Sequence, residues 1–214
     1  MRAKQAYIVA LAATKGGVGK TTLAAALAVR AMEDGARVAL IDADPQASLA
    51  RWWELRGEPD NPRVLDVPCG QEAIGLVAAE GFDWVIVDTP PALIDEISAA
   101  VNMAHYAIVP VRPSAIDIEA VDQVKEICET LGKPFAFLLN AVQPTWRLTE
   151  QAERYLESDG KVLPARICYR KAYISAMTLG KTGPELERDG KCREEIDALW
   201  ALVKAQTRRA ARAR

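Results

Sequence analysis

The sequence has no long apolar run, only four cysteines and a single histidine. No apolar stretch approaches the roughly 20 residues that a helix needs to cross a bilayer, so we expect no membrane-spanning segment. Cys69, Cys128, Cys168 and Cys192 form no C-x-x-C pair and have no histidine close to them, which argues against a zinc or redox-pair site and favours free thiols. His105 borders an apolar segment without an identifiable catalytic partner, so we expect a structural role for it.

The sequence also lacks internal repeats and low-complexity linkers. Its 214 residues, half of them apolar, suffice for a sizeable core, so we expect one domain over residues 1–214. Residues 161–214 hold 13 Lys and Arg against 6 Asp and Glu, a net charge of +7, which leaves 14 basic against 23 acidic residues, a net of −9, in the rest. The basic quarter predicts a surface that faces a polyanion. For residues 206–214 the alternative is a basic tail that is solvated or disordered.

The segment A-T-K-G-G-V-G-K-T-T, residues 13–22, matches a phosphate-binding loop in a deviant form. The pattern G-x-x-x-x-G-K-[ST] needs glycine where Thr14 stands, and Lys15 adds a second lysine. Glycines let backbone N–H groups close round a phosphate, Lys20 can reach the β- and γ-phosphate oxygens, and the Thr21 hydroxyl can bind Mg²⁺. An apolar segment before the loop and a helical pattern after it supply the strand, loop and helix that such a site requires.

Three acidic residues stand directly after or close behind other apolar segments. Asp42 and Asp44 follow residues 38–41, and Asp88 follows residues 84–87. We expect Asp88 to reach Mg²⁺ through water, as the carboxylate at this position does in many P-loop proteins. Because Asp42 and Asp44 alternate faces of an extended segment, we expect different roles for them. The alternative for an aspartate at a strand end is a helix cap.

Short apolar runs that are typical of strands alternate along the chain with helical segments. The runs are residues 7–12, 38–41, 64–67, 84–87, 107–111, 135–139 and 162–163. This alternation predicts an α/β fold with a mainly parallel, twisted sheet, helices on both faces, and the ligand outside the carboxyl ends of the strands. The glycine-rich loop, Asp42, Asp44, Asp88 and Asn140 all fall at such ends, so we expect a single nucleotide site there.

Three ordered motifs resemble the ParA/MinD group of deviant P-loop ATPases. They are K-G-G-V-G-K-T-T from Lys15, I-D-A-D-P-Q from Ile41 and W-V-I-V-D-T-P-P from Trp84. Later segments, at residues 108–113, 138–140 and 163–171, are more similar to ParA than to its relatives. The resemblance covers nearly the whole chain and implies a short form, without the N-terminal DNA-reading domain of many ParA proteins.

The resemblance implies ATP and Mg²⁺ as cofactors and gives the site residues their roles. Nucleotide binding would fall to Gly16, Gly17, Val18, Gly19, Lys20, Thr21 and Thr22, with Asn140 and Pro164 bracketing the adenine. Thr21, Asp42 and Asp88 would hold Mg²⁺. In catalysis, Lys20 would stabilise the phosphate charge, Asp44 would orient or deprotonate the attacking water, and Lys15 would reach the nucleotide of a second subunit as a cation supplied in trans.

The resemblance also implies partners and a cellular role. ATP would drive a sandwich homodimer that binds DNA without sequence preference, and a ParB-like or other cargo adaptor would stimulate hydrolysis. Plasmid, chromosome or protein-complex cargo would be segregated or positioned by this cytoplasmic, nucleoid-associated protein. The residues that match or lie close to the family's DNA-binding surface are Arg166, Arg170, Lys171, Lys181 and Arg193.

Two alternatives stay open from the sequence. A MinD-like peripheral membrane switch would use a helix over residues 193–205, whose apolar stripe of Ile196, Leu199, Trp200 and Val203 suits a lipid interface. Packing of that stripe against the sheet is the interpretation we favour. A synthetase that phosphorylates a carboxylate could use the same fold, although the D-A-D-P-Q segment argues against it.

Overall fold

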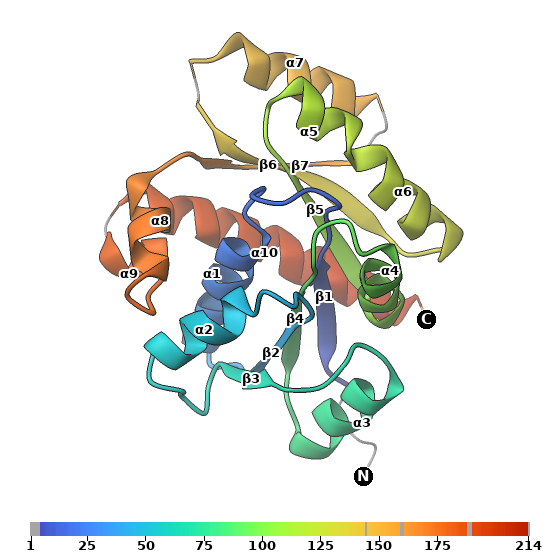
Figure 1. Ribbon diagram of the computed structural model, residues 1–214, viewed down its shortest axis with the longest axis vertical. Helices are drawn as coiled ribbons and strands as arrows, with labels where there is room; N and C mark the ends of the chain where they lie inside the picture. The colour runs from blue at the N-terminus through green and yellow to red at the C-terminus, as the bar shows by residue number, and fades with distance from the viewer. Residues whose placement is uncertain (1–4, 144, 159–160, 188–189, 214) are drawn as a thin grey trace.

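The computed structural model describes residues 5–143, 145–158, 161–187 and 190–213. Over these residues the chain forms a seven-stranded, all-parallel sheet in the order β3-β2-β4-β1-β5-β6-β7 (Figure 1). The strands are β1 (Tyr7–Leu11), β2 (Val38–Asp42), β3 (Arg63–Leu65), β4 (Trp84–Asp88), β5 (Tyr106–Val111), β6 (Phe135–Val142) and β7 (Val162–Cys168). The predicted α/β fold with a parallel sheet is confirmed.

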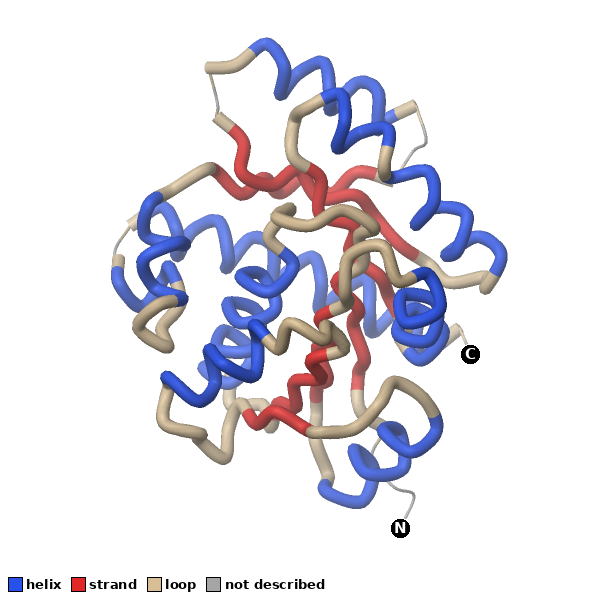
Figure 2. The backbone as a smooth tube through the Cα atoms, viewed as in Figure 1, coloured by secondary structure: helices blue, strands red, loops and turns tan. Residues whose placement is uncertain are grey.

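Helices cover both faces of this sheet, as Figure 2 shows with helices in blue and strands in red. One face is covered by α1 (Lys20–Glu33), α2 (Ser48–Leu55), α8 (Lys171–Met177) and α10 (Lys191–Arg212). The other face is covered by α3 (Gln71–Glu80), α4 (Ile94–Met103), α6 (Val121–Thr130) and α7 (Arg147–Glu157). Two short helices complete the layers: α5 (Ala115–Glu119) lies against α6 and α7, and α9 (Gly183–Leu186) lies against α8 and α10.

The central strands are buried because each contributes side chains to two cores. In β1, Val9 and Leu11 join the core under α1 and α10, whereas Ile8 and Ala10 join the core under α3 and α4. Successive side chains of a strand point to opposite faces, so a strand covered on both faces must be apolar throughout. This explains why the central strands appear in the sequence as continuous apolar runs rather than as alternating ones.

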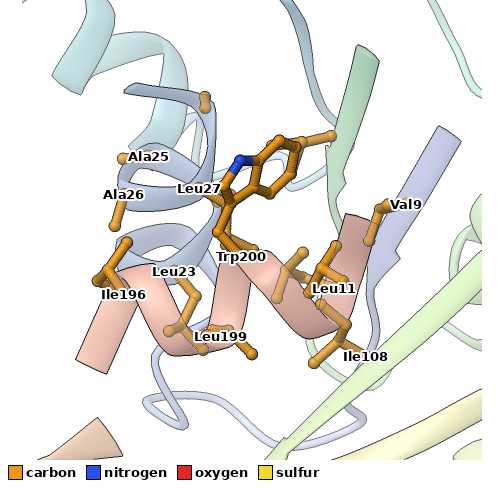
Figure 3. Packing of buried hydrophobic residues seen from close by; sticks show 14 of the residues in the cluster. Val9, Leu11, Leu23, Ala25, Ala26, Leu27, Ile108, Ile196, Leu199 and Trp200 are labelled. Atoms are coloured by element: carbon orange, nitrogen blue, oxygen red, sulfur yellow. The ribbon is translucent and has the colours of Figure 1, made fainter. Parts of the chain in front are cut away.

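Helix α10 is the long C-terminal helix, and its apolar stripe packs against α1 and the sheet (Figure 3). The indole of Trp200 is 1% exposed, lies 4.7 Å from the Trp84 ring and donates a hydrogen bond to Asp34 Oδ2 at 2.8 Å. The favoured interpretation of the stripe is therefore confirmed, and this face of α10 is not available to a lipid surface. Within the described residues, no helix combines the length and apolarity needed to cross a membrane.

The structure extends α10 beyond the end that the sequence predicts. The helix continues to Arg212 instead of ending near Ala205, so residues 206–212 form regular helix rather than a disordered basic tail. Alanine and arginine are strong helix formers, and Thr207 is buried, which holds this part of the helix against the fold. Arg214 lies outside the described residues.

Several strand boundaries also differ from the prediction; for example, β6 ends at Val142 rather than at Leu139. Strand β3 ends at Leu65 rather than at Val67, and β7 runs seven residues from Val162 to Cys168 instead of two. The β7 pattern alternates, with Leu163, Ala165 and Ile167 buried and the residues between them exposed, because β7 is an edge strand with one covered face.

His105 has the structural role that the sequence predicts. The Ile8 backbone N–H donates to His105 Nδ1 at 3.0 Å, and Gln5 Nε2 lies 3.2 Å from His105 Nε2. The imidazole is buried and ties the residue before β5 to the start of β1. All four cysteines are free thiols, as expected.

Candidate nucleotide site

The phosphate-binding loop joins β1 to α1 and adopts a conformation that requires glycine. Gly17 and Gly19 have φ angles of 74° and 93°, in the left-handed region that other residues avoid. A Cβ atom on Gly19 would also overlap the Asn140 side chain, whose Nδ2 donates to the Val18 carbonyl at 2.6 Å. The Asn140 side chain, which comes from β6, therefore helps to fix the conformation of the loop.

Thr14, the departure from the strict loop pattern, ties the loop to two neighbouring segments. Its hydroxyl donates to the Ala120 carbonyl at 3.1 Å, and its own carbonyl accepts the Ala92 N–H at 2.9 Å. Ala120 lies at the junction of α5 and α6, and Ala92 lies between β4 and α4. A glycine at position 14 would lose the first of these bonds.

Lys20 places a buried ammonium inside the loop. The residue is 6% exposed, and its Nζ donates to the carbonyls of Ala13 at 3.3 Å and Lys15 at 3.2 Å. The pKa of Lys20 lies below its ordinary value, because the effect of burial outweighs the opposing effect of the nearby Asp88 and Asp44 carboxylates. A buried cation held by neutral carbonyls fits an anionic ligand such as a polyphosphate.

Thr21 and Asp88 form the pair that the sequence predicts for Mg²⁺. Thr21 Oγ1 donates to Asp88 Oδ2 at 2.5 Å. Asp88 is 1% exposed, and its other oxygen, Oδ1, has no hydrogen-bond partner among the described residues. Burial raises the pKa of Asp88 to about 7, with a hydrogen bond from Thr21 opposing the shift and the charge of Asp42 adding to it. An orphaned buried carboxylate oxygen beside a hydroxyl fits a hard divalent cation, bound directly or through water.

Asp42 and Asp44 have different surroundings, in line with the prediction of different roles. Asp42 Oδ1 accepts the Asp44 N–H at 3.1 Å, and its Oδ2 accepts the N–H groups of Leu49 and Ala50, each at 2.9 Å. Asp42 therefore caps the start of α2, which is the alternative that the sequence left open. Its position beside Asp88 on the neighbouring strand keeps it near the proposed metal site, where a metal-binding role stays a prediction. Burial raises the pKa of Asp42.

Two cavities meet at the phosphate-binding loop. The first has a volume of about 680 Å³ and is lined by the loop, Lys20, Thr21, Asp44 and residues of α2. The second, about 590 Å³, shares Gly17, Gly19 and Thr22 with the first. The two volumes are sufficient for the phosphates and the base of a nucleotide to lie on either side of the loop.

Asn140 lines the second cavity, but Pro164 does not. Pro164 is exposed in the middle of β7 and lines a separate hollow with Glu153 and Glu157. Because β7 runs further than predicted, its carboxyl end falls at Cys168, and the segment after it reaches the cavity instead. The structure therefore does not bring Pro164 to the place that the sequence assigned to it.

Three aromatic residues of the second cavity were not predicted from the sequence. Trp146, Tyr169 and Tyr173 follow the carboxyl ends of β6 and β7 and line the cavity with Asn140. Aromatic side chains just beyond the strand ends were the available signal, because planar rings suit a planar base.

Lys15 does not point into solvent. Its Nζ lies 2.7 Å from Asp117 Oδ1 in the same chain. Asp117 is 2% exposed on its side chain and also accepts hydrogen bonds from Arg112 Nε at 2.9 Å and Ser114 Oγ at 2.7 Å. Burial by itself would raise the pKa of Asp117, but the hydrogen bonds from Arg112, Lys15 and Ser114 hold it below its usual range. The sequence signal was the S-x-x-D spacing of a helix cap, which Ser114 and Asp117 form at α5.

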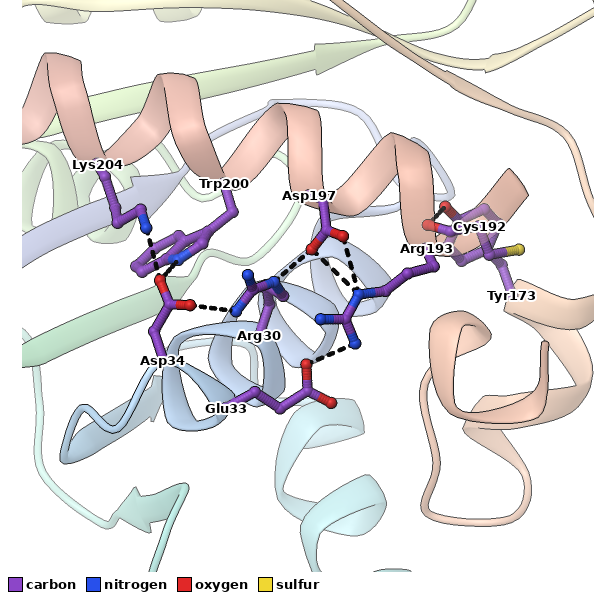
Figure 4. A network of polar contacts seen from close by, with 9 residues as sticks. All are labelled: Arg30, Glu33, Asp34, Tyr173, Cys192, Arg193, Asp197, Trp200 and Lys204. Atoms are coloured by element: carbon purple, nitrogen blue, oxygen red, sulfur yellow. Dashed lines mark hydrogen bonds and ion pairs between the residues drawn. The ribbon is translucent and has the colours of Figure 1, made fainter. Parts of the chain in front are cut away.

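The five basic residues assigned to DNA binding fall into two kinds. The arginines are ion-paired: Arg166 with Glu153, Arg170 with Glu195 at 2.5 Å, and Arg193 with Glu33 at 2.8 Å and Asp197 at 2.9 Å. Figure 4 shows the Arg193 pairs within a network that joins α10 to α1. Lys171 and Lys181 are exposed near α8. The sequence did not reveal these ion pairs, because most of the acidic partners lie on other helices and are brought close only by the fold.

The comparisons with known proteins agree with this fold and with a nucleotide-binding domain. Residues 9–182 match the model of the CobQ/CobB/MinD/ParA nucleotide binding domain. The chain is 34% identical to a "Maintenance of carboxysome distribution protein A" of Gloeobacter kilaueensis, over 90% of this chain and 95% of that protein. It is 32% identical to a virC1 protein of Rhizobium radiobacter, over 76% of each. Among solved structures, the MinD cell division protein of Aquifex aeolicus superposes with a TM-score of 0.77 at 18% identity, over 94% of this chain and 98% of that chain.

These findings define a nucleotide-binding domain of the P-loop class. The chain belongs to the CobQ/CobB/MinD/ParA family and, within it, to the ParA/MinD type of ATPases.

Proposed function

We propose that this protein is a ParA-type ATPase in which ATP drives formation of a sandwich dimer on DNA of any sequence. A partner protein bound to cargo stimulates hydrolysis and returns the protein to its free form. The observation that carries the proposal is the Thr21–Asp88 pair, whose buried carboxylate oxygen Oδ1 has no partner among the described residues, beside the buried Lys20; Lys20 and Thr21 line the first cavity. These are the groups that phosphoryl transfer to water requires, since its loose transition state needs charge stabilisation more than covalent chemistry.

In this proposal each side chain has one task. Lys20 and the loop amides hold the phosphates, and Thr21 and Asp88 hold Mg²⁺, which neutralises charge on the phosphate oxygens when bound. Asp44, which lines the same cavity, orients the attacking water. Asn140 and the aromatic residues of the second cavity hold the base.

The similarity to carboxysome-distribution proteins supports a large protein assembly as the cargo. Plasmid or other DNA cargo is the alternative that the similarity to ParA and virC1 proteins supports. Binding to the nucleoid in the cytoplasm is part of the same proposal, because neutralisation of phosphates by lysine and arginine gives affinity without sequence preference. The burial of Trp200 disfavours the MinD-like alternative through α10.

The dimer cycle can be tested with a variant that separates binding from hydrolysis. With ATP and Mg²⁺, Asp44→Ala should bind nucleotide normally, lose most of its hydrolysis and accumulate as a dimer, because the water is no longer oriented. Light scattering measures the dimer and phosphate release measures turnover. Asp60→Ala, at an exposed aspartate in the loop before β3, is the matched control and should behave as wild type. An Asp44→Ala protein that stays monomeric with ATP would refute the proposed cycle.

A further inference from the structure

Lys15 is held within its own subunit by a carboxylate that the rest of the site does not use. Asp117 is buried at the start of α5, where the Ser114 hydroxyl caps the helix and also donates to the Asp117 carboxylate at 2.7 Å. Lys15 Nζ lies 2.7 Å from Asp117 Oδ1, and the Lys15 side chain is 31% exposed. The lysine is thus fixed against the body of the protein at one end of the phosphate-binding loop.

The same lysine cannot make this contact and extend into a partner subunit. A cation supplied in trans must leave its own chain and approach the phosphates of the other subunit. Breaking the contact with Asp117 is therefore a step that dimer formation has to include. The cost of that step depends on what Asp117 keeps when Lys15 leaves.

When Lys15 leaves, Asp117 keeps three hydrogen bonds, two from the Arg112 guanidinium and one from the Ser114 hydroxyl. Arg112 donates from Nε to Oδ2 at 2.9 Å and from Nη2 to Oδ1 at 3.3 Å, and Ser114 donates to Oδ2. Loss of its only partner strongly destabilises a buried carboxylate, whereas a carboxylate that stays paired with another cation is destabilised far less. Because Arg112 stays paired with Asp117, release of Lys15 does not leave the buried carboxylate without a cation, and the release can be reversible.

Arg112 also lies beside the loop. Its Nη1 would be 3.9 Å from a Cβ atom at Gly17, and Arg112 lines the second cavity together with Asp117. Phosphates held at the loop glycines that the two cavities share would bring negative charge close to the Arg112 guanidinium beside Gly17 and to Lys15 in the same loop. The contact between Lys15 and Asp117 is therefore placed where nucleotide binding can weaken it.

We propose that Asp117 is a positioning residue that holds Lys15 in the monomer, so that ATP-dependent dimerisation proceeds by transfer of Lys15 from Asp117 to the partner's nucleotide. This inference rests on the proposed function and deepens it, since it names the group that holds Lys15 away from the partner's nucleotide in the monomer. Removing the charge of Asp117 should release Lys15 and favour the dimer.

The first experiment tests the contact without requiring a dimer. Lysine acetylation by an N-hydroxysuccinimide ester, followed by mass spectrometry on the nucleotide-free protein, compares Lys15 with the exposed lysines Lys171 and Lys191. Lys15 should react several-fold more slowly than those two in the wild type and at a similar rate in Asp117→Asn. Asp117→Glu, which keeps the charge, should retain most of the protection. Equal reaction of Lys15 and Lys171 in the wild type would overturn the proposal even if no variant folds.

The second experiment measures the consequence for dimerisation. Asp117→Asn should lower the dimer dissociation constant with ATP and Mg²⁺, by roughly two- to fivefold for each lysine released and thus roughly four- to 25-fold for a dimer that releases two. Asp122→Asn, at an exposed aspartate on α6, is the matched control and should leave the constant unchanged. In a Lys15→Ala background, Asp117→Asn should have no effect, because the lysine through which it acts is gone.

The outcomes separate this inference from the proposed function. A wild-type protein that never dimerises with ATP would refute the proposed function, while slow acetylation of Lys15 would still support the contact. Tighter dimerisation of Asp117→Asn in both lysine backgrounds would show that Asp117 acts through another group, and so would overturn the inference alone.

Discussion

Trp200 Nε1 and Lys204 Nζ donate to the same oxygen, Oδ2 of Asp34, at 2.8 Å and 2.5 Å, and so join α10 to the end of α1. Arg30 donates to the other oxygen of Asp34 at 2.5 Å and also pairs with Asp197 (Figure 4). Because α1 begins at the phosphate-binding loop, this connection fixes the far end of the helix that presents Lys20 and Thr21.

This network predicts how stability depends on pH. The hydrogen bond from Lys204, followed by those from Trp200 and Arg30, holds the pKa of Asp34 below the ordinary value of 3.8. A depressed folded pKa stabilises the protein above the unfolded pKa, and this contribution is lost as the pH falls through the folded value. Asp34→Asn should therefore lower the free energy of unfolding by about 1 kcal/mol at pH 7, and the difference from wild type should shrink progressively below about pH 4. Urea unfolding across that range measures it, and a difference that grows with acid would contradict the assignment.

Lys20→Ala should weaken ATP binding by roughly 10- to 100-fold or more, because the buried ammonium contributes charge-assisted hydrogen bonds to the phosphates. Titration calorimetry gives the affinity directly. Lys191→Ala, which removes an exposed lysine at the start of α10, is the control and should bind as wild type does. Unchanged affinity in Lys20→Ala would mean that the phosphates bind elsewhere.

The two tryptophans Trp200 and Trp146 should separate stability from nucleotide binding. Trp200 is 1% exposed, so Trp200→Ala should destabilise the fold by about 3–5 kcal/mol. Trp146 is 45% exposed and lines the second cavity, so Trp146→Ala should leave unfolding nearly unchanged and weaken ATP binding by roughly two- to tenfold, because the ring no longer stacks on the base. Thermal melts and calorimetry on both variants test the pair. Equal melting temperatures for the two variants would contradict this division.

Among the basic residues assigned to DNA binding, Lys171 and Lys181 are exposed, so we expect them to contact DNA phosphates. With ATP and Mg²⁺, Lys171→Ala or Lys181→Ala should weaken binding to the same extent on unrelated DNA sequences. Each substitution should reduce the slope of log K against log salt by about 0.9 for every DNA phosphate that the lysine neutralises in the wild type. A dimer presents each lysine twice, so the reduction should approach roughly 1.8. Fluorescence anisotropy over a salt series measures this slope.

The control for the DNA experiment is Arg63→Ala, which removes a basic residue at the start of β3, opposite the edge of the sheet that carries the nucleotide site. Its slope should equal that of wild type. Arg170→Ala and Arg193→Ala should also weaken binding, but they release the carboxylates of Glu195, Glu33 and Asp197, so their melting temperatures need to be measured beside their affinities. A wild-type slope in both lysine variants would place the DNA surface elsewhere.

The sequence predicts this architecture well because parallel strands buried on both faces must be continuous apolar runs, and because their carboxyl ends meet at one edge. The positions of Lys20, Thr21 and Asp88 could be predicted for the same reason. Lys20 and Thr21 follow the loop after one apolar run, and Asp88 ends another. Pro164 could not be placed, because an edge strand with alternating burial gives a weak pattern and its end was predicted too early. The contact between Lys15 and Asp117 depends on tertiary structure that brings α5 to the loop, and no local pattern encodes it.

The packing of α10 on α1 and β1 has a consequence for the order in which the protein is made. Leu23 and Leu27 of α1 share a core with Ile196 and Leu199 of α10, which leave the ribosome after every strand of the sheet. Until residues 191–212 emerge, one face of the nascent sheet and the helix that follows the nucleotide loop stay uncovered, and exposed apolar surface of this kind is prone to aggregate. We therefore expect a chain that ends before Lys191 to be prone to aggregation and proteolysis, because the core that supports the nucleotide loop is incomplete without α10.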